Sequence, residues 1–306
     1  MDDFLSARPQ LFALAYRMLG SASEAEDVLQ EAWLRWSQSK GLINPAAWLT
    51  TVVTRLCLDL LGSARVRRET YVGPWLPEPL VDSVDGPEQA AELADSVSLA
   101  FLVLLEELSP SQRAALLLRE VFHYDYDEVA EILERTPASC RQLVSRARDH
   151  LESRRTRFTA DRDRAQELTK VFLLACQTGD LASVTAMLAA DAFLVTDGGG
   201  KVSAARRPVL GADRVARFLI GVVAKDAAGA GYVQATVNGE PGVVIVIDGV
   251  VITVVAVELL GDLVTAVRIV SNPDKLASVD PPTAGHPSTW SMRSAELSPR
   301  PALPSS

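Results

Sequence analysis

Side chains of the types that read DNA bases are concentrated between Asp125 and Leu151. Thr136 and Pro137 predict a helix start here, because threonine caps a first turn and proline at the first helical position loses no hydrogen bond. Apolar residues recur on one side of this helix every three or four positions, and the other side is polar: Ser139, Arg141, Gln142, Ser145, Arg146 and Arg148. Together with the apolar helix before it, this pattern predicts a helix-turn-helix with its second helix in the DNA major groove.

Arg141 and Gln142 have planar groups that form paired hydrogen bonds with guanine and adenine edges. Seven arginines between residues 135 and 157 stand against two acids, although the chain as a whole carries a net charge of -9. This basic segment favours DNA binding over the alternative, two ordinary helices of a bundle. The turn contains Glu134 and Arg135 where a glycine is commoner, so the sequence does not determine its geometry.

Composition limits the classes of protein to consider. The 306 residues suggest two domains or three small ones, and 48% hydrophobic residues are enough to form cores. Cys57, Cys140 and Cys176 are far apart and lie in no Cys/His cluster, so neither a disulfide framework nor a metal site is predicted. No signal peptide or membrane span is predicted either. We expect a cytoplasmic protein without a cofactor that binds DNA locally, together with a partner.

Helical patterns also fill the N-terminal part of the chain. One helix is predicted over 11–19, and Ser23 with Glu26 forms a capping box for a second helix that runs to Trp36. The polar face of the second helix fits either a solvated surface or a docking face for a basic partner; it carries Asp27, Gln30, Glu31 and Leu34. A third helix over 46–64 has a basic end and follows a polar loop, and these two features could hold a flipped or single-stranded nucleotide.

A linker is predicted over residues 67–94, which contain four prolines and several acids. Within it, the run Trp75-Leu76-Pro77-Glu78-Pro79 is unusual, because a tryptophan and a leucine between prolines need an apolar pocket. The run is either a strap on its own domain or a docking peptide for another domain. We favour the docking peptide, because a further domain follows.

The C-terminal half is predicted as an α+β domain. Helices are expected over 165–178, 181–189 and 213–223, and strands over 232–237, 243–247, 250–260 and 263–270. Asn238-Gly239 and Asp248-Gly249 separate the first strands, and such pairs are strong hairpin signals. We expect an antiparallel meander with helices on one face.

Two blocks of this sequence resemble the extracytoplasmic-function group of bacterial RNA polymerase sigma factors. RPQLFALAYRMLGSASEAEDVLQEAWLRW resembles their region 2, and LSPSQRAALLLREVFHYDYDEVAEILERTPASCRQLVSRARDHL resembles their region 4, in the expected order. The resemblance implies two all-α sigma domains, 1–70 and 97–158, joined by the Pro-rich linker 71–96. It also implies that the protein binds core RNA polymerase and directs it to promoter DNA.

Carried over by position, the resemblance implies three sets of functional residues. The set that would contact polymerase is Asp27, Gln30, Glu31 and Leu34. The set that would open and read the -10 element, with the loop before Asn44, is Arg55, Asp59, Arg65, Arg67 and Arg68. The set that would read the -35 element is Thr136, Ser139, Arg141, Gln142, Arg146 and Arg148.

The C-terminal pattern resembles the SnoaL-like, cone-shaped α+β fold, which we expect over 160–276, followed by a disordered tail over 277–306. The motifs WLPEP, DGGGK and NPDKL resemble the sigma-factor subgroup with a fused SnoaL-like extension, which includes sigma factor J-like proteins. That resemblance implies that the extension regulates the sigma domains and that no separate anti-sigma factor is expected. The interdomain residues would be Trp75, Leu76, Pro77, Asp197, Gly198, Gly199, Gly200, Lys201, Asn272, Pro273, Asp274 and Lys275.

Catalysis by the extension is the main alternative, because SnoaL-like folds also host enzymes. No histidine lies between His150 and His286, and the candidate base is Glu258. Its pKa would be raised if its strand face is interior, and otherwise it would be a plain surface acid. We assign no catalytic residue. Three hypotheses stay open: a small apolar ligand in the cone, an enzyme fused to an incidental helix-turn-helix, and a repressor or activator that binds operators alone.

Overall fold

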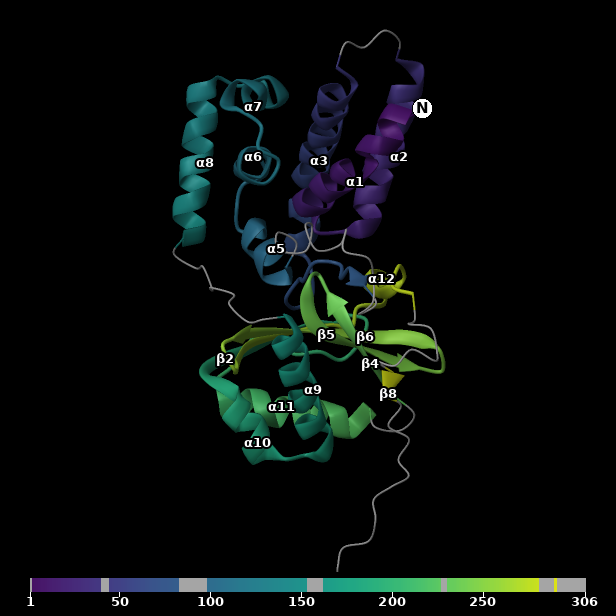
Figure 1. The fold of residues 1–306 in the computed structure, drawn as a ribbon, viewed down its shortest axis with the longest axis vertical. Helices are drawn as coiled ribbons and strands as arrows, with labels where there is room; N and C mark the ends of the chain where they lie inside the picture. Colours follow the sequence, from purple (N-terminus) through teal and green to yellow (C-terminus); the bar gives the residue numbers. More distant parts are fainter. Residues whose placement is uncertain are drawn as a thin grey trace, which may run out of the picture.

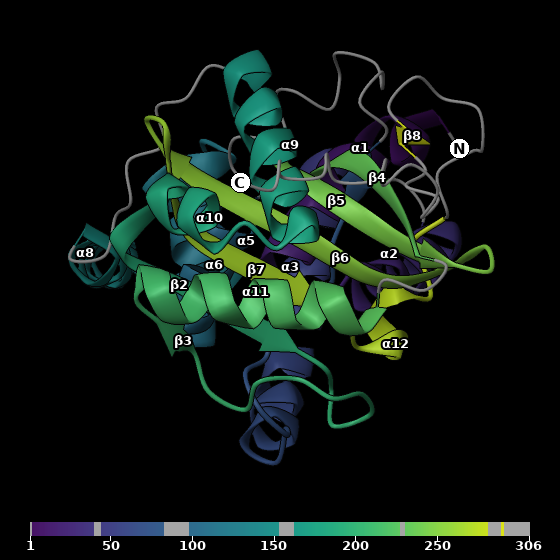
Figure 2. The same ribbon diagram turned by 90° about the horizontal axis from the view of Figure 1, so that it is seen from below.

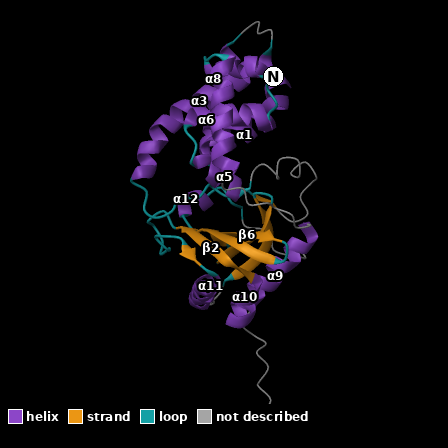
Figure 3. Cartoon of the chain, turned by 90° about the vertical axis from the view of Figure 1, so that its left-hand side faces the viewer, coloured by secondary structure: helices purple, strands orange, loops and turns teal. Residues whose placement is uncertain are grey.

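The computed structural model describes residues 2–39, 44–82, 98–152, 162–226, 230–280 and 289–290. Figure 1 shows three layers along the long axis: a block of helices, a β-sheet below it, and a second group of helices under the sheet. Figure 3 shows the same order from the side, with the orange strands between two purple helical layers. None of the described helices combines the length and the apolar character that crossing a membrane would require.

The N-terminal helices are α1 (Asp2–Leu19), α2 (Ala22–Gln38) and α3 (Pro45–Glu69). As predicted, α1 ends at Gly20, whose φ of 68° is a left-handed conformation that glycine adopts without strain. The predicted capping box of Ser23 and Glu26 is wrong. The N-cap of α2 is Ser21, whose side chain accepts a hydrogen bond from the Glu24 N–H at 3.2 Å. Ser23 lies inside the first turn, because the chain is extended only up to Ser21 and is helical from Ala22 on.

The second set of helices is α5 (Leu99–Glu106), α6 (Pro110–Leu116), the π-helical turn η1 (Leu117–Val121), α7 (Tyr126–Leu133) and α8 (Pro137–Glu152). The predicted helix-turn-helix is confirmed as α7 and α8. A capping box that pairs Asp125 with Glu128 starts α7. In the turn, Glu134 has a φ of 53°, so a glutamate occupies the left-handed position at which a glycine is common.

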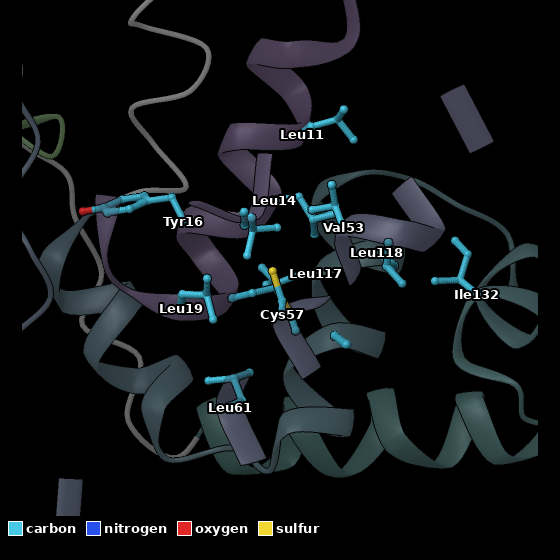
Figure 4. Close-up of a cluster of buried hydrophobic side chains, with 14 of the residues drawn as sticks. Leu11, Leu14, Tyr16, Leu19, Val53, Cys57, Leu61, Leu117, Leu118 and Ile132 are labelled. Carbon is cyan, nitrogen blue, oxygen red and sulfur yellow. The ribbon is translucent and has the colours of Figure 1, made fainter. Parts of the chain in front are cut away.

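The two sets of helices share one hydrophobic core. In Figure 4, Leu14 of α1 and Val53 of α3 lie beside Leu117 and Leu118 of η1, and all four are buried. Cys57 lies among them, and its burial raises the pKa of its thiol. The helices of the two sigma-like blocks therefore pack against each other in this structure, and the shared interior is aliphatic.

The C-terminal part has helices α9 (Arg162–Thr178), α10 (Leu181–Met187) and α11 (Ala212–Asp226) on one face of the sheet, as Figure 2 shows. The predicted meander is confirmed. Its strands are β4 (Gly231–Val237), β5 (Glu240–Ile247), β6 (Val250–Leu260) and β7 (Leu263–Val270), each antiparallel to the next. Asn238 and Asp248 have φ of 51°, as two-residue hairpin turns require.

The sheet is larger than the sequence predicts, with the strand order β1-β4-β5-β6-β7-β2-β3. β2 (Leu188–Asp197) pairs in parallel with β7 and has β3 (Val209–Leu210) on its other side. β1 (Val81–Asp82) comes from the linker and pairs with β4. A short strand, β8 (Thr289–Trp290), also pairs with β4, within the segment that the sequence predicts as a disordered tail.

The sheet face opposite α9–α11 is covered by the linker and by α5. Alternate strand residues such as Val254 and Ala256 form one apolar cluster with Leu76 of the linker and Leu99 of α5. Because side chains alternate along a strand, Glu258 belongs to this same face. The sigma-like helices therefore cover a sheet face that would otherwise be exposed.

The charged side chains buried on this face include Glu240, Glu258 and Arg268. The sequence left two alternatives for Glu258, an interior base or a surface acid. Glu258 lies in the interior, where it forms an ion pair with Arg268. Glu240 lies against the backbone N–H of Leu99 at the start of α5. Burial raises the pKa of Glu240 to about 7, although the charge of Arg268 and the Leu99 N–H act in the opposite direction.

This raised pKa predicts a pH-dependent effect of Glu240→Gln on stability. Between about pH 4.5 and pH 7 the unfolded chain loses the Glu240 proton while the folded chain keeps it, so the wild type loses stability as pH rises. The variant lacks this penalty and should gain up to about 3 kcal/mol over the wild type on going from pH 5 to pH 8. The measurement is the difference in Tm at the two pH values, with the exposed Glu31→Gln as control. An equal difference at both would contradict it.

Candidate nucleic-acid interface and the linker contacts

Helix α8 has the two faces that its sequence predicts. Its apolar side is buried: Cys140, Val144 and Ala147. Its polar side is exposed: Arg141, Gln142, Ser145, Arg146 and Arg148. Thr136 caps the helix and accepts a hydrogen bond from the Ser139 N–H at 3.2 Å. The base-reading forks of Arg141 and Gln142 therefore lie on an open surface within the first turns, where the helix dipole also favours phosphate.

Tyr126, the first residue of α7, is a component of this surface that the sequence did not reveal. The guanidinium carbon of Arg141 lies 5.1 Å from the centre of its ring, and that of Arg119 lies 4.9 Å from the same centre. Arg148 also has a partner, Glu120, at 2.5 Å. Two of the predicted -35 residues are therefore positioned by neighbours. The sequence signal was an aromatic residue at a helix start, but no local pattern links it to Arg141.

The predicted -10 residues lie on α3. Arg55 and Asp59 are exposed one turn apart. Arg55 forms an ion pair of 2.9 Å with Glu134, the left-handed residue in the turn of the helix-turn-helix. The remaining predictions lie outside the described side chains: Arg65, Arg67, Arg68 and loop residues 40–43. The structure thus brings a predicted -10 residue into contact with the -35 module.

The face of α2 predicted to contact polymerase is accessible. Asp27 and Gln30 are exposed, and Leu34 has 48% of its surface accessible. Glu31 pairs with Arg35 of the same helix at 2.9 Å. Because that pair is exposed, water screens it strongly, and a basic partner could replace Arg35 at little cost.

The linker strap, Tyr71 to Leu80, is attached to the N-terminal helices by Glu78. The Glu78 carboxylate is 2% exposed and accepts hydrogen bonds of 2.9–3.2 Å from Ser21 and Ser23 at the start of α2. Ser278 from the C-terminal part donates to its other oxygen at 2.7 Å. A buried carboxylate at a helix N-terminus is favoured by the helix dipole and by these donors. Glu78 therefore joins the start of α2 to the segment that contains Ser278.

Asp197 attaches the strap to the C-terminal domain. Its buried carboxylate accepts hydrogen bonds from the Tyr71 hydroxyl at 2.5 Å and from the Leu76 N–H at 2.8 Å. Lys275 pairs with it at 2.7 Å and lies 4.1 Å from the centre of the Trp75 ring. Burial and the bond to Asp197 raise the pKa of Tyr71. Residues from the WLPEP, DGGGK and NPDKL motifs thus meet around one buried charge.

The other predicted interdomain residues support this contact in different ways. A Cβ on Gly199 would come within 2.4 Å of the Asn272 side chain, so only glycine fits there. Asn272 caps α12 (Pro273–Leu276) and donates to the Tyr71 hydroxyl at 2.9 Å. Leu76 and Pro77 are buried, whereas Lys201 and Asp274 form an exposed ion pair of 2.6 Å.

A second contact between the strap and the sheet involves residues that the sequence did not single out. The Tyr16 hydroxyl of α1 donates to the Glu78 carbonyl at 2.7 Å and accepts from the Asn238 side chain at 2.7 Å. Asn238, in the β4–β5 turn, also exchanges hydrogen bonds with the backbone of Leu80. The Asn-Gly pair reads only as a hairpin turn in the sequence, because its partners are more than a hundred residues away.

Comparison with known protein families and relatives gives a consistent result. A family model described as Sigma-70 region 2 matches residues 4–67, and one described as Sigma-70, region 4 matches residues 98–151. The ECF RNA polymerase sigma factor SigJ of Mycobacterium tuberculosis is 40% identical over 90% of this chain and 92% of its own length. A probable ECF sigma factor of the same species, SigI, is 31% identical over 88% of this chain and 92% of its length.

Solved structures add to this comparison. The crystal structure of SigJ from Mycobacterium tuberculosis matches with a TM-score of 0.74 and 37% identity, and covers 90% of this chain and 98% of that chain. The sigma factor RpoE of Bartonella quintana, solved in complex with the anti-sigma factor NepR, matches half of this chain at a TM-score of 0.37. The expectation that no separate anti-sigma factor takes part stays a prediction.

The Asp197 contact predicts that Asp197→Ala will destabilise the protein strongly. Removal of this carboxylate takes the ion pair from the mostly buried Lys275 and the acceptor from the buried Leu76 N–H, which should cost roughly 3–5 kcal/mol. The matched control is Asp274→Ala, which breaks the exposed pair with Lys201 and should cost less than about 1 kcal/mol. Denaturant unfolding of both variants measures the two losses. Similar losses would show that Asp197 has no special structural role.

Proposed function

The chain belongs to the extracytoplasmic-function (ECF) RNA polymerase sigma factors, and on that premise we propose that its own C-terminal domain holds regions 2 and 4 in a closed arrangement. Sigma factors bind core RNA polymerase and promoter DNA and direct promoter-specific initiation. In the closed arrangement, the -10 module on α3 and the -35 module on α8 pack on each other. Productive binding of a promoter then requires their separation.

The observation that carries this proposal is the shared core of the two modules. Leu117 and Leu118 of region 4 are buried with Leu14 and Val53 of region 2. By their positions, the -10 and -35 elements are separated by about 25 base pairs, or roughly 85 Å of B-form DNA. Two modules in van der Waals contact do not span that distance. The described arrangement therefore fits a factor that is not bound to promoter.

Polar contacts across the same junction support the closed arrangement. Arg113 of α6 is buried and donates to the Met18 carbonyl at 2.5 Å and to Glu106 at 2.7 Å. Its burial lowers the pKa of Arg113 to about 10, which still leaves it charged at neutral pH. Arg55 pairs with Glu134 in the turn of region 4. In the closed arrangement Arg55 of region 2 thus has its carboxylate partner in region 4.

Exposed surfaces of α8 and α2 are available for the two binding roles of a sigma factor. The -35 element would be read by the exposed face of α8, with Tyr126 positioning Arg141. The exposed acidic face of α2 would contact polymerase. The C-terminal domain would act as a structural regulator, because the strap and α5 occupy one face of its sheet and Arg268 neutralises Glu258. An apolar ligand in that domain stays a hypothesis without a specific observation in its favour.

A reversible crosslink between the two modules provides the direct test. With Arg55→Cys and Glu134→Cys, a cleavable bismaleimide should hold the modules together and abolish run-off transcription with core polymerase. Cleavage should restore it, because the modules can then separate. The three native cysteines are buried, so the reagent should react with the introduced ones. Each variant is compared with itself before crosslinking, so the loss of Arg55 does not confuse the result.

The matched control joins two positions within region 2. Arg8 and Glu26 form an exposed ion pair of 2.6 Å between α1 and α2, and a crosslink between cysteines there should leave transcription unchanged. Full activity of the Arg55→Cys/Glu134→Cys factor while crosslinked would eliminate the closed arrangement as an inactive state. It would leave the assignment to the sigma factors untouched.

Promoter reading by α8 gives a separate prediction. Arg141→Ala should lose roughly 1–3 kcal/mol of discrimination at one base pair of the -35 element, which is about a 5- to 150-fold change. The measurement is the affinity of the reconstituted holoenzyme for promoter fragments that carry each base at that position. Arg8→Ala, an exposed arginine in region 2, is the control. An unaltered base preference would remove Arg141 from the reading surface.

A further inference from the structure

The C-terminal domain carries a basic segment that neither sigma region contains. Between Gly198 and Arg217 there are five basic side chains and one acidic one, in a chain whose net charge is -9. Lys201 pairs with Asp274 and Arg217 pairs with Asp213. The other three are Arg206, Arg207 and Arg214, which are exposed, and the ion pairs seen among the described residues include none of them. Arg214 also interacts with the charge of Asp213, so Arg206 and Arg207 are the two that have no acidic neighbour among the described residues. Two such arginines on an acidic protein indicate an anionic partner.

The loop that bears Arg206 and Arg207 has a fixed position. Ala205 exchanges two hydrogen bonds with the Thr196 hydroxyl at the end of β2, at 2.8 and 3.2 Å. A Cβ on Gly73 would come within 3.8 Å of the Arg206 Cα, so the loop touches the linker strap. The buried bonds of Asp197 hold strap and loop together from the other side. The two arginines are therefore presented in one place before any partner binds.

That place is next to the end of α3. Gly73 follows the last residue of α3, Glu69, by four positions, and the last turns of α3 contain Arg65, Arg67 and Arg68 in the sequence. Figures 2 and 3 show the end of α3 extending toward the loop between β2 and β3. The C-terminal end of α3 and the basic loop of the C-terminal domain thus come together at one edge of the molecule.

We propose that Arg206 and Arg207 bind the phosphates of promoter DNA just upstream of the -10 element. The inference rests on the proposed role of α3 in reading that element. Duplex DNA that leaves the end of α3 toward the -35 element must pass this edge, and exposed guanidinium groups without carboxylate partners match its charge. Because the strap joins this loop to region 2, the contact survives the separation of region 4.

Salt dependence of promoter binding tests this contact. Each phosphate neutralised contributes about -0.9 to the slope of log affinity against log salt concentration. With core polymerase, the full-length Arg206→Ala/Arg207→Ala factor should therefore bind a promoter fragment with a slope about 1–2 shallower than wild type. Arg217→Ala is the control, because that arginine is also exposed but lies on α11, outside the loop that carries Arg206 and Arg207. The control should keep the wild-type slope.

A second DNA fragment and a binding assay without DNA separate the remaining explanations. On a promoter fragment cut at the upstream edge of the -10 element, wild type and double variant should bind equally. A defect that persists on this fragment would overturn the proposal, as would an unchanged slope on the long fragment. Weaker binding of the double variant to core polymerase alone would assign the arginines to a protein surface instead. Run-off transcription by the wild-type factor with core polymerase tests the proposed function separately from the role of the two arginines.

Discussion

The buried linker strap is the constraint on which the rest of the structure depends. The strap contacts two domains at once. Its Glu78 carboxylate accepts a hydrogen bond from Ser21 at the start of α2, and its Tyr71 and Leu76 donate to Asp197 of the C-terminal domain. A strap with three prolines loses little conformational entropy when it is held this way, because its unfolded state is already restricted. The buried carboxylates then give direction to the contact, since each needs donors from both sides. Region 2 and the C-terminal domain consequently behave as one unit.

Region 4 is held differently, and the difference matters for function. Its contacts with region 2 are mainly apolar, through side chains such as Leu117, Leu118 and Ile132, with Arg113 and Arg55 at the edges. Apolar contacts are not directional, so the same side chains can pack against another apolar surface without loss. On the proposed opening, the helices of region 4 after α5 would leave the apolar seam, while the polar contacts of the strap keep region 2 and the C-terminal domain joined.

The sequence was informative where the determinants are local. The faces of α8, the cap at Thr136 and the hairpins at Asn238 and Asp248 depend on neighbours a few residues away. It failed where a distant partner decides. The hydroxyls of Ser21 and Ser23 both bond the distant Glu78 carboxylate, and β2 pairs with a strand some seventy residues later. The motif residues around Asp197 followed from resemblance, whereas Tyr16, Tyr71 and Tyr126 carry no local signature of the groups that they contact.

The energetics of opening follow from the seam between regions 2 and 4. Exposure of one buried leucine or valine costs about 1.5–3 kcal/mol, so separation of a seam built on a few such side chains costs several kcal/mol. If the open form is only a small fraction of the protein, the apparent affinity for promoter is lowered in proportion to that fraction. Polymerase can supply the difference if it binds the open form better, because a ligand shifts an equilibrium only by its differential affinity. On the proposed assignment, the face of α2 would offer polymerase a first contact that needs no opening, since Asp27, Gln30 and Leu34 are exposed in this structure. Association with polymerase would then precede separation of region 4, and promoter binding would follow from the assembled enzyme.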